Sequence, residues 1–351
     1  MRRRAAVLVA AAVLGWWGVC GAGEPNVTLD WRVEFADQQT ARRILTTVDD
    51  HVRAMSPFDR MVRLEKEGPV SQEEYLAWVG EAALEWSAAQ KQQTEKALGP
   101  IRGRFRELGV RLPETVYLIQ TTGQEEGGSP YTRQNAVMLP RALLRRRAEA
   151  LGGILAHELY HVMTRANQPL RQALYGVIGF EACEPIELPP AWRPRRISNP
   201  DAPHFDAVIR LEVQGRSITA TLALISKSDT YHGGGLMSYL LPCFLEVEKA
   251  DGRWVARMQD DQPVWHRPAE VEGLKEKVGE NTGYLIHPEE ILADNFGLPA
   301  TGRTDVSSPE IMERMELILR RQGDVVPPAR APKTVLPFDE AMVVPSKQKA
   351  E

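Results

Sequence analysis

Two histidines four positions apart, in the stretch His157-Glu158-Leu159-Tyr160-His161 (HELYH), decide how this chain is interpreted. The stretch lies inside a longer segment whose apolar residues recur at helical spacing. On a helix, residues i and i+4 project from the same face, so both imidazoles can reach one ion. Zinc binds neutral imidazole nitrogen readily and, in catalytic sites, keeps one position open for water. We therefore predict a zinc site with His157 and His161 as ligands and Glu158 as the general base.

Two carboxylates compete for the position of the third ligand. Glu181 lies 20 residues beyond His161, in a stretch that runs into prolines and is a poor helix. Glu290 lies 129 residues beyond His161, in the helical pattern EILADN of residues 290–295. On that helix Glu290 and Asp294 share a face, so one carboxylate can bind metal while the other hydrogen-bonds a ligand histidine. We favour Glu290 as the third ligand.

The pair of motifs HELYH and EILADN resembles the gluzincin metallopeptidases, the group that contains thermolysin and neprilysin. In those enzymes an HExxH helix is completed by a glutamate in an ExxxD pattern on a later helix. The resemblance implies that His157, His161 and Glu290 bind Zn²⁺, with Glu158 as the general base and Asp294 as the carboxylate that orients a ligand. It also implies peptide-bond hydrolysis by metal-activated water. The segment 135–139 (NAVML) resembles the edge strand on which such enzymes bind an extended peptide.

A further hydrogen-bond donor normally stabilises the oxyanion of such a reaction. Tyr231 and His232, before three consecutive glycines, and Tyr284, just ahead of the EILADN segment, are the candidates. None lies in a distinctive motif, and an ordinary structural or surface role is the favoured alternative for each of them.

The amino terminus indicates export. Three arginines, at positions 2–4, precede an apolar run from Ala5 to Val19 and then the small residues Gly21, Ala22 and Gly23. This pattern is typical of a secretory signal, which we place at 1–23. The run is shorter than the roughly 20 apolar residues of a spanning helix, although an uncleaved anchor is the alternative. We expect a periplasmic or extracellular protein.

Cysteine usage leaves one pairing open. Cys20 lies within the predicted signal, so Cys183 and Cys243 are the cysteines of the mature chain. In an oxidising compartment these two would pair and close a loop of about 60 residues. Two buried free thiols are the alternative.

The periodicity along the chain indicates an α+β fold. We expect an N-terminal helical region over 24–110, broken at Gly99-Pro100, and a zincin-like catalytic domain over 111–322. A β-rich insertion over about 180–275 would separate the HELYH helix from the Glu290 helix, and residues 323–351 read as a disordered tail. The formal net charge of −4 over 351 residues argues against nucleic acid or an anionic membrane as the partner.

These observations define a leading hypothesis and two alternatives. The first is a zinc metallopeptidase that acts on a peptide or protein substrate. The second is a non-catalytic zincin-fold binding protein of the cell envelope, which would use the inserted β region. The third is an envelope scaffold with an accidental HELYH. The carboxylate of Glu158 argues against the second, because a purely structural site needs no base, and EILADN argues against the third.

Overall fold

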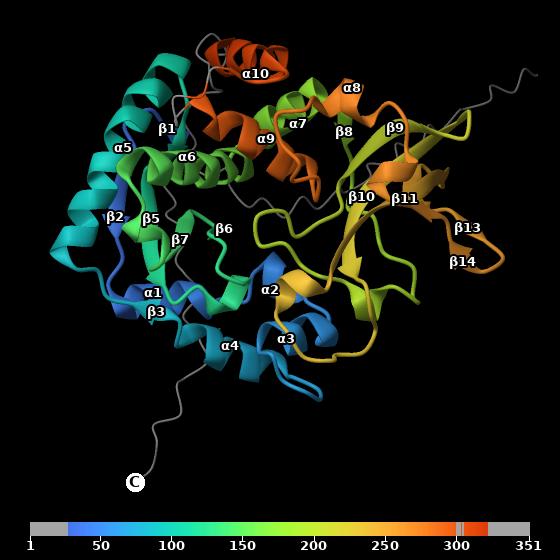
Figure 1. Cartoon of the computed structure of the whole chain (residues 1–351), viewed down its shortest axis with the longest axis horizontal. Helices are drawn as coiled ribbons and strands as arrows, with labels where there is room; N and C mark the ends of the chain where they lie inside the picture. Colours follow the sequence, from blue (N-terminus) through green and yellow to red (C-terminus); the bar gives the residue numbers. More distant parts are fainter. Residues whose placement is uncertain (1–26, 300–302, 304, 322–351) are drawn as a thin grey trace, which may run out of the picture.

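The computed structural model of this chain describes residues 27–299, 303 and 305–321, and they form a mixed α+β fold (Figure 1). Two sheets organise the fold. The first sheet precedes the HELYH helix in the chain, and the second, the insertion sheet, follows that helix and precedes the Glu290 helix. The predicted signal peptide (1–23) and the predicted tail (323–351) lie outside the described residues.

The first sheet has the strand order β2-β5-β7-β6, with β3 also paired to β5. Its strands are β2 (Arg32–Phe35), β3 (Ala83–Leu84), β5 (Thr115–Thr121), β6 (Tyr131–Arg133) and β7 (Ala136–Pro140). β2 and β7 run parallel to β5, whereas β6 runs antiparallel to β7. A separate pair joins β1 (Val27–Thr28) to β4 (Leu112–Pro113). β1 and β2 therefore bring the segment 27–35 into two separate sheets.

β7 is an interior strand, so our prediction that 135–139 forms the peptide-binding edge is wrong. Val137 is paired with Leu118 of β5 on one side and with Thr132 of β6 on the other. The outer strand is β6. Its three residues follow directly on a glycine-rich loop, and so short a stretch has no period-2 pattern to identify it.

Four helices cover the first sheet: α1 (Gln38–Leu45), α4 (Gln72–Gly80), α5 (Ala88–Leu108) and α6 (Ala148–Arg165). Alternation along β7 sends its side chains to two cores. Val137 and Leu139 pack in the core that includes α5 and α6, whereas Ala136 and Met138 pack in the core that includes α1 and α4. The HELYH helix, α6, therefore lies on one face of the sheet and is buried along most of its length.

Helix α5 continues through Gly99-Pro100, where the sequence predicts a break. Proline in a helix interior removes one backbone hydrogen bond and usually kinks or ends the helix. Here Leu98, Ile101 and Phe105 are all buried against the sheet side of the molecule. The burial of apolar side chains on both sides of Pro100 offsets this cost, because tertiary packing supplies most of the stability of helices in proteins.

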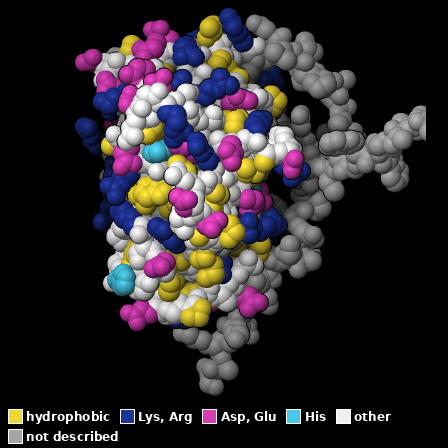
Figure 2. Space-filling view, turned by 90° about the vertical axis from the view of Figure 1, so that its right-hand side faces the viewer, with side chains coloured by type: hydrophobic (Ala, Val, Ile, Leu, Met, Phe, Trp, Pro, Cys, Tyr) yellow, Lys and Arg dark blue, Asp and Glu magenta, His cyan; other side chains and the backbone are white. Residues whose placement is uncertain are grey.

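The insertion sheet has the strand order β12-β11-β10-β9-β8, with β15 also paired to β11. Its strands are β8 (Phe180–Ala182), β9 (Ala207–Val213), β10 (Arg216–Ser226), β11 (Leu240–Ala250), β12 (Arg253–Ala256) and β15 (Trp265–His266), and a small ribbon of β13 (Met258–Gln259) and β14 (Gln262–Pro263) extends from it. Asp251 and Gly252 both have positive φ in the turn between β11 and β12, as a tight hairpin requires. Side chains of both charges are interspersed on the face of the molecule seen in Figure 2.

Cys183 and Cys243 are free thiols, so the predicted disulfide is wrong. Cys243 lies on β11, whereas Cys183 directly follows β8, and β9 and β10 lie between these two strands. Neighbouring strands are about 4.8 Å apart, so three steps separate the two backbones by about 14 Å. A disulfide needs Cα atoms within about 7 Å. Burial raises the pKa of Cys243 to about 12 and, with nearby carboxylates, that of Cys183 to about 11.

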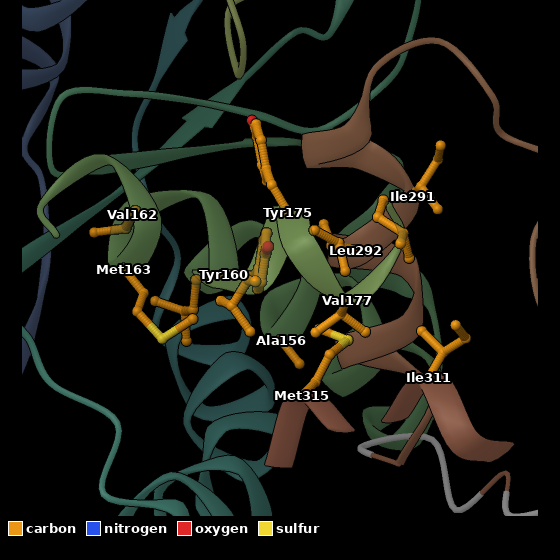
Figure 3. Packing of buried hydrophobic residues seen from close by; sticks show 14 of the residues in the cluster. Ala156, Tyr160, Val162, Met163, Tyr175, Val177, Ile291, Leu292, Ile311 and Met315 are labelled. Atoms are coloured by element: carbon orange, nitrogen blue, oxygen red, sulfur yellow. The ribbon is translucent and has the colours of Figure 1, made fainter. Parts of the chain in front are cut away.

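The remaining described helices are α2 (Asp50–Ala54), α3 (Pro57–Arg63), α7 (Gln168–Val177), α8 (Leu274–Val278), α9 (Pro288–Gly297) and α10 (Pro309–Arg321). Side chains from α6, α7, α9 and α10 meet in one apolar core, as Figure 3 shows for Tyr160, Val177, Leu292 and Met315. This packing fixes α9 against α6, although about 120 residues separate them in the chain. No described helix combines the length and the apolar character that crossing a lipid bilayer would require.

Candidate metal centre

Two helices from distant parts of the sequence bring the predicted ligands together. His157 and His161 lie one turn apart on α6, with ring centroids 4.9 Å apart. Glu290 lies in the first turn of α9. Gly297, in the last turn of α9, permits close approach of the two helices, because a Cβ atom there would lie 3.0 Å from the backbone oxygen of Gly153.

The carboxylate of Glu290 faces both imidazoles. Its Oε2 atom lies 3.3 Å from His157 Nε2 and 3.6 Å from His161 Nε2. One potential ligand atom from each of the three residues lies within 4.8 Å of the other two. The alternative third ligand, Glu181, is an exposed residue of β8 and does not belong to this group. The structure therefore brings together the three residues that we favour as ligands.

Missing hydrogen bonds at two buried polar atoms indicate whether this cluster fits a metal ion. His161 Nε2 and Glu158 Oε2 are shielded from solvent and have no hydrogen-bond partner within the described ranges of the chain. A buried polar atom without a partner is costly and therefore rare. A cation between the imidazoles and the carboxylate would interact with His161 Nε2. Two imidazole nitrogens and one carboxylate oxygen are a ligand set that zinc uses in catalytic sites, so the residues fit Zn²⁺.

Each histidine has a carboxylate on its far nitrogen. Asp294 Oδ1 lies 2.9 Å from His157 Nδ1, which is the contact that the shared helix face predicts. Glu289 Oε1 lies 3.4 Å from His161 Nδ1. Such contacts fix the tautomer in which Nε2 is free to bind a metal.

Glu289 was not among the residues we predicted, yet it is the most connected carboxylate of the cluster. It accepts hydrogen bonds from the Tyr175 hydroxyl at 2.7 Å and from Arg171 Nε at 3.3 Å, and it also contacts the Thr164 hydroxyl. The sequence carries no signal that distinguishes Glu289, because acidic residues are common in the first turn of a helix. Only the fold shows that this acid faces His161.

Glu158 forms a second cluster with His161 and Asp201, again with one potential ligand atom from each within 4.8 Å. Glu158 is 2% exposed. Burial, reinforced by the negative charge of Asp201, raises the pKa of Glu158 to about 8. A carboxyl group with a pKa near neutrality suits a group that must both accept and return a proton. Asp201 lies in a loop between β8 and β9, where no sequence motif identifies it.

The charges in the cluster favour cation binding. Burial opposes the charge of His157, but hydrogen bonds to Asp294 and Glu290 raise its pKa to about 10. Burial opposes the charge of Glu290 as well, but His161 and His157 hold the pKa of this carboxyl well below its usual value. In the absence of metal, the carboxylates therefore retain protons on the imidazoles. Because zinc binds neutral imidazole, metal binding here would release protons.

The three candidate oxyanion donors lie in different surroundings. Partial burial and then the negative charges of Glu290 and Asp201 raise the pKa of Tyr284, although the residue is 39% exposed, so the charges of the cluster act on its hydroxyl. Tyr231 instead donates to the Gly234 carbonyl, and the backbone N–H of His232 donates to Tyr239. Within the described residues, no contact links Tyr231 or His232 to the cluster. Of the three, Tyr284 alone is within electrostatic range of the cluster, and it remains the candidate.

Comparison of the chain with protein-family models, with curated proteins and with solved structures found no match. The geometry of this cluster and the two motifs that supply it are therefore the features of the chain that bear on its function.

Proposed function

We propose that this protein is an exported, zinc-dependent hydrolase of peptide bonds with a zincin-like catalytic core. The observation that carries the proposal is the convergence of His157, His161 and Glu290, with His161 Nε2 buried and without a hydrogen bond. Two sequence motifs more than a hundred residues apart supply these three residues. An accidental HELYH gives no reason for a carboxylate from another helix to face both imidazoles.

His157, His161 and Glu290 would hold the ion in this proposal. When bound, zinc supplies a Lewis acid that polarises a carbonyl group and acidifies water. Glu158 would take the proton from the attacking water and deliver it to the leaving amine. The carboxylates of Asp294 and Glu289 would hold the two imidazoles in the tautomer that binds metal. Tyr284 is the remaining candidate for donating a hydrogen bond to the developing oxyanion.

Peptide cleavage by the mature chain tests the proposal. The zinc-loaded protein is incubated with a mixture of fluorogenic peptides, and the products are mapped by mass spectrometry. We expect cleavage that a chelator abolishes and added zinc restores. Glu158→Gln is the matched variant, since it preserves volume and zinc binding but cannot accept the proton. Its rate should fall by roughly 10²- to 10⁴-fold. A wild-type protein that binds no zinc, or equal cleavage by both proteins, would contradict the proposal.

One observation favours a second candidate, a non-catalytic zincin-fold binding protein. The backbone N–H of Thr132, on the outer strand β6, donates to Asp201 Oδ1 at 2.7 Å. An extended peptide that pairs with β6 needs that donor, so Asp201 competes with it. The two candidates differ in one result: a zinc-loaded wild-type chain that cleaves no peptide in the mixture supports the binding protein.

Export is a separate part of the proposal and depends on the basic and apolar residues of 1–23. The intact mass of the exported chain tests it. Cleavage after Ala22 or Gly23 gives a released protein, whereas a full-length mass in the membrane fraction supports the uncleaved anchor.

A further inference from the structure

The segment Ser198–Asp201, which we call the site loop, lies between β8 and β9 and contacts the candidate metal centre. Ser198 is 2% exposed and anchors the loop at one end. Its backbone N–H donates to Asp59 Oδ2 at 2.8 Å, and its carbonyl accepts from Arg63 Nη2 at 2.7 Å. Asp59 and Arg63 are themselves an ion pair with side chains at most 1% exposed. This end of the loop is therefore attached to a buried part of α3.

The other end of the site loop is attached to the two elements beside the metal centre. Asp201 Oδ1 accepts hydrogen bonds from the backbone N–H and the hydroxyl of Thr132 on β6, at 2.7 and 2.6 Å. The Asp201 carbonyl accepts from Arg165 Nη2 at 3.2 Å, and Arg165 is the last residue of α6. The loop is thus held at both ends, and Asn199 lies between the anchors.

Two contacts determine the orientation of the Asn199 amide. Asn199 Oδ1 accepts the backbone N–H of Asp201 at 3.0 Å. The oxygen must face this donor, so the NH₂ group points the other way. There Nδ2 donates to Glu290 Oε1 at 2.7 Å. The carboxylate is held by this bond at Oε1, and its other oxygen, Oε2, is the atom that faces both histidines.

From this geometry we propose that Asn199 is a positioning residue for the metal centre. It fixes the rotation of the Glu290 carboxylate and thereby presents Oε2 to the ion, without touching the ion itself. The inference rests on the proposed zinc site. Outer partners of metal ligands typically contribute 10- to 100-fold to metal affinity, so the effect is large enough to measure.

Two substitutions separate positioning from loop structure. Asn199→Asp and Asn199→Ser both keep an oxygen that can accept the Asp201 N–H, so both preserve the turn of the site loop. Asn199→Ser removes the donor to Glu290, and Asn199→Asp replaces it with a second negative charge. Asn135→Ala is the control, because it removes an amide that donates to the Thr115 carbonyl in the first sheet.

The experiment measures zinc affinity by competition with a chromogenic chelator and records the visible spectrum of the Co²⁺-loaded proteins. Circular dichroism confirms that each variant is folded. We expect the affinity to fall about 10-fold for Asn199→Ser, and the Co²⁺ spectrum to change for both Asn199 variants, with affinity and spectrum unchanged for Asn135→Ala.

The possible results distinguish this inference from the proposed function. If the wild type binds zinc and the Asn199 variants match it in affinity and spectrum, the positioning role is refuted while the zinc site stands. If the wild-type chain binds no zinc, the proposed function fails, and the positioning role fails with it.

Discussion

Replacement of Glu289 by glutamine removes one buried charge and leaves the shape of the side chain almost unchanged. Burial opposes ionisation of Glu289, but the hydrogen bond from His161 and the charge of Arg171 lower its pKa to about 2. It is therefore a carboxylate at neutral pH. Its partners include the Tyr175 hydroxyl at 2.7 Å and Arg171 Nε at 3.3 Å, and the residue is 2% exposed.

The expected loss of stability follows from the number of hydrogen bonds that the charged carboxylate of Glu289 accepts. A hydrogen bond to a charged group contributes about 1.5–3 kcal/mol and a neutral one about 0.5–1.5, so each weakened bond costs about 1 kcal/mol. The contacts from Tyr175, Thr164 and His161 therefore sum to about 3 kcal/mol. Arg171 is not left unpaired, since Asp206 binds it through two bonds at 2.8 and 2.9 Å. With about 2.1 cal/mol/K of unfolding entropy per residue over the roughly 290 described residues, the melting temperature should fall by about 5 °C.

The assay has a stability arm and a metal arm. Denaturant unfolding of the metal-free protein measures the lost free energy, and chelator competition measures zinc affinity, which should fall about 10-fold as His161 loses its orienting carboxylate. Glu181→Gln is the control, because this exposed glutamate should change stability by less than about 0.5 kcal/mol. If Glu289→Gln behaves like this control in both arms, the role we assign to Glu289 is refuted.

Three further predictions concern the scaffold. A thiol titration of the denatured protein without reductant should detect two reactive thiols, from Cys183 and Cys243. A titration that detects neither thiol would instead support a disulfide between them. Hydrogen bonds to Arg216 and His266 lower the pKa of Glu246 despite burial, so its stabilising effect is present above its usual pKa of 4.5 and is lost as the pH falls further. Unfolding curves of Glu246→Gln and wild type should therefore converge in acid, and a constant difference would contradict this. Gly103→Ala, on α5 with open space around it, should stabilise the fold by about 1 kcal/mol; a lower melting temperature would refute this.

Local pattern predicts the elements whose side chains repeat often enough to identify them. The helix of HELYH, the hairpins of the insertion sheet and the helix beginning at Pro288 all have such patterns. β2 and β6 do not, because they have only four and three residues. β2 is defined by pairing with the distant strand β5, and β6 by pairing with β7 directly after it. The successive pairing of β8, β9, β10 and β11 places two strands between Cys183 and Cys243, which the spacing of the two cysteines alone does not reveal.

The residues of the candidate site also divide into those that local pattern predicts and those that it does not. His157 and His161 are related by one helical turn, and so are Glu290 and Asp294, so helix geometry alone pairs them. Asn199 cannot be found in this way. It lies in a loop without a motif, and its contact with Glu290 depends on where α3, β6 and α6 hold the ends of that loop.

The central claim is that one zinc ion binds between α6 and α9. Anomalous diffraction at the zinc edge from crystals of the zinc-loaded protein tests it most directly. We predict a single strong peak within about 2.2 Å of His157 Nε2, His161 Nε2 and a Glu290 oxygen. A peak at Glu181 or at any other residues, or no peak in zinc-soaked crystals, would contradict the account.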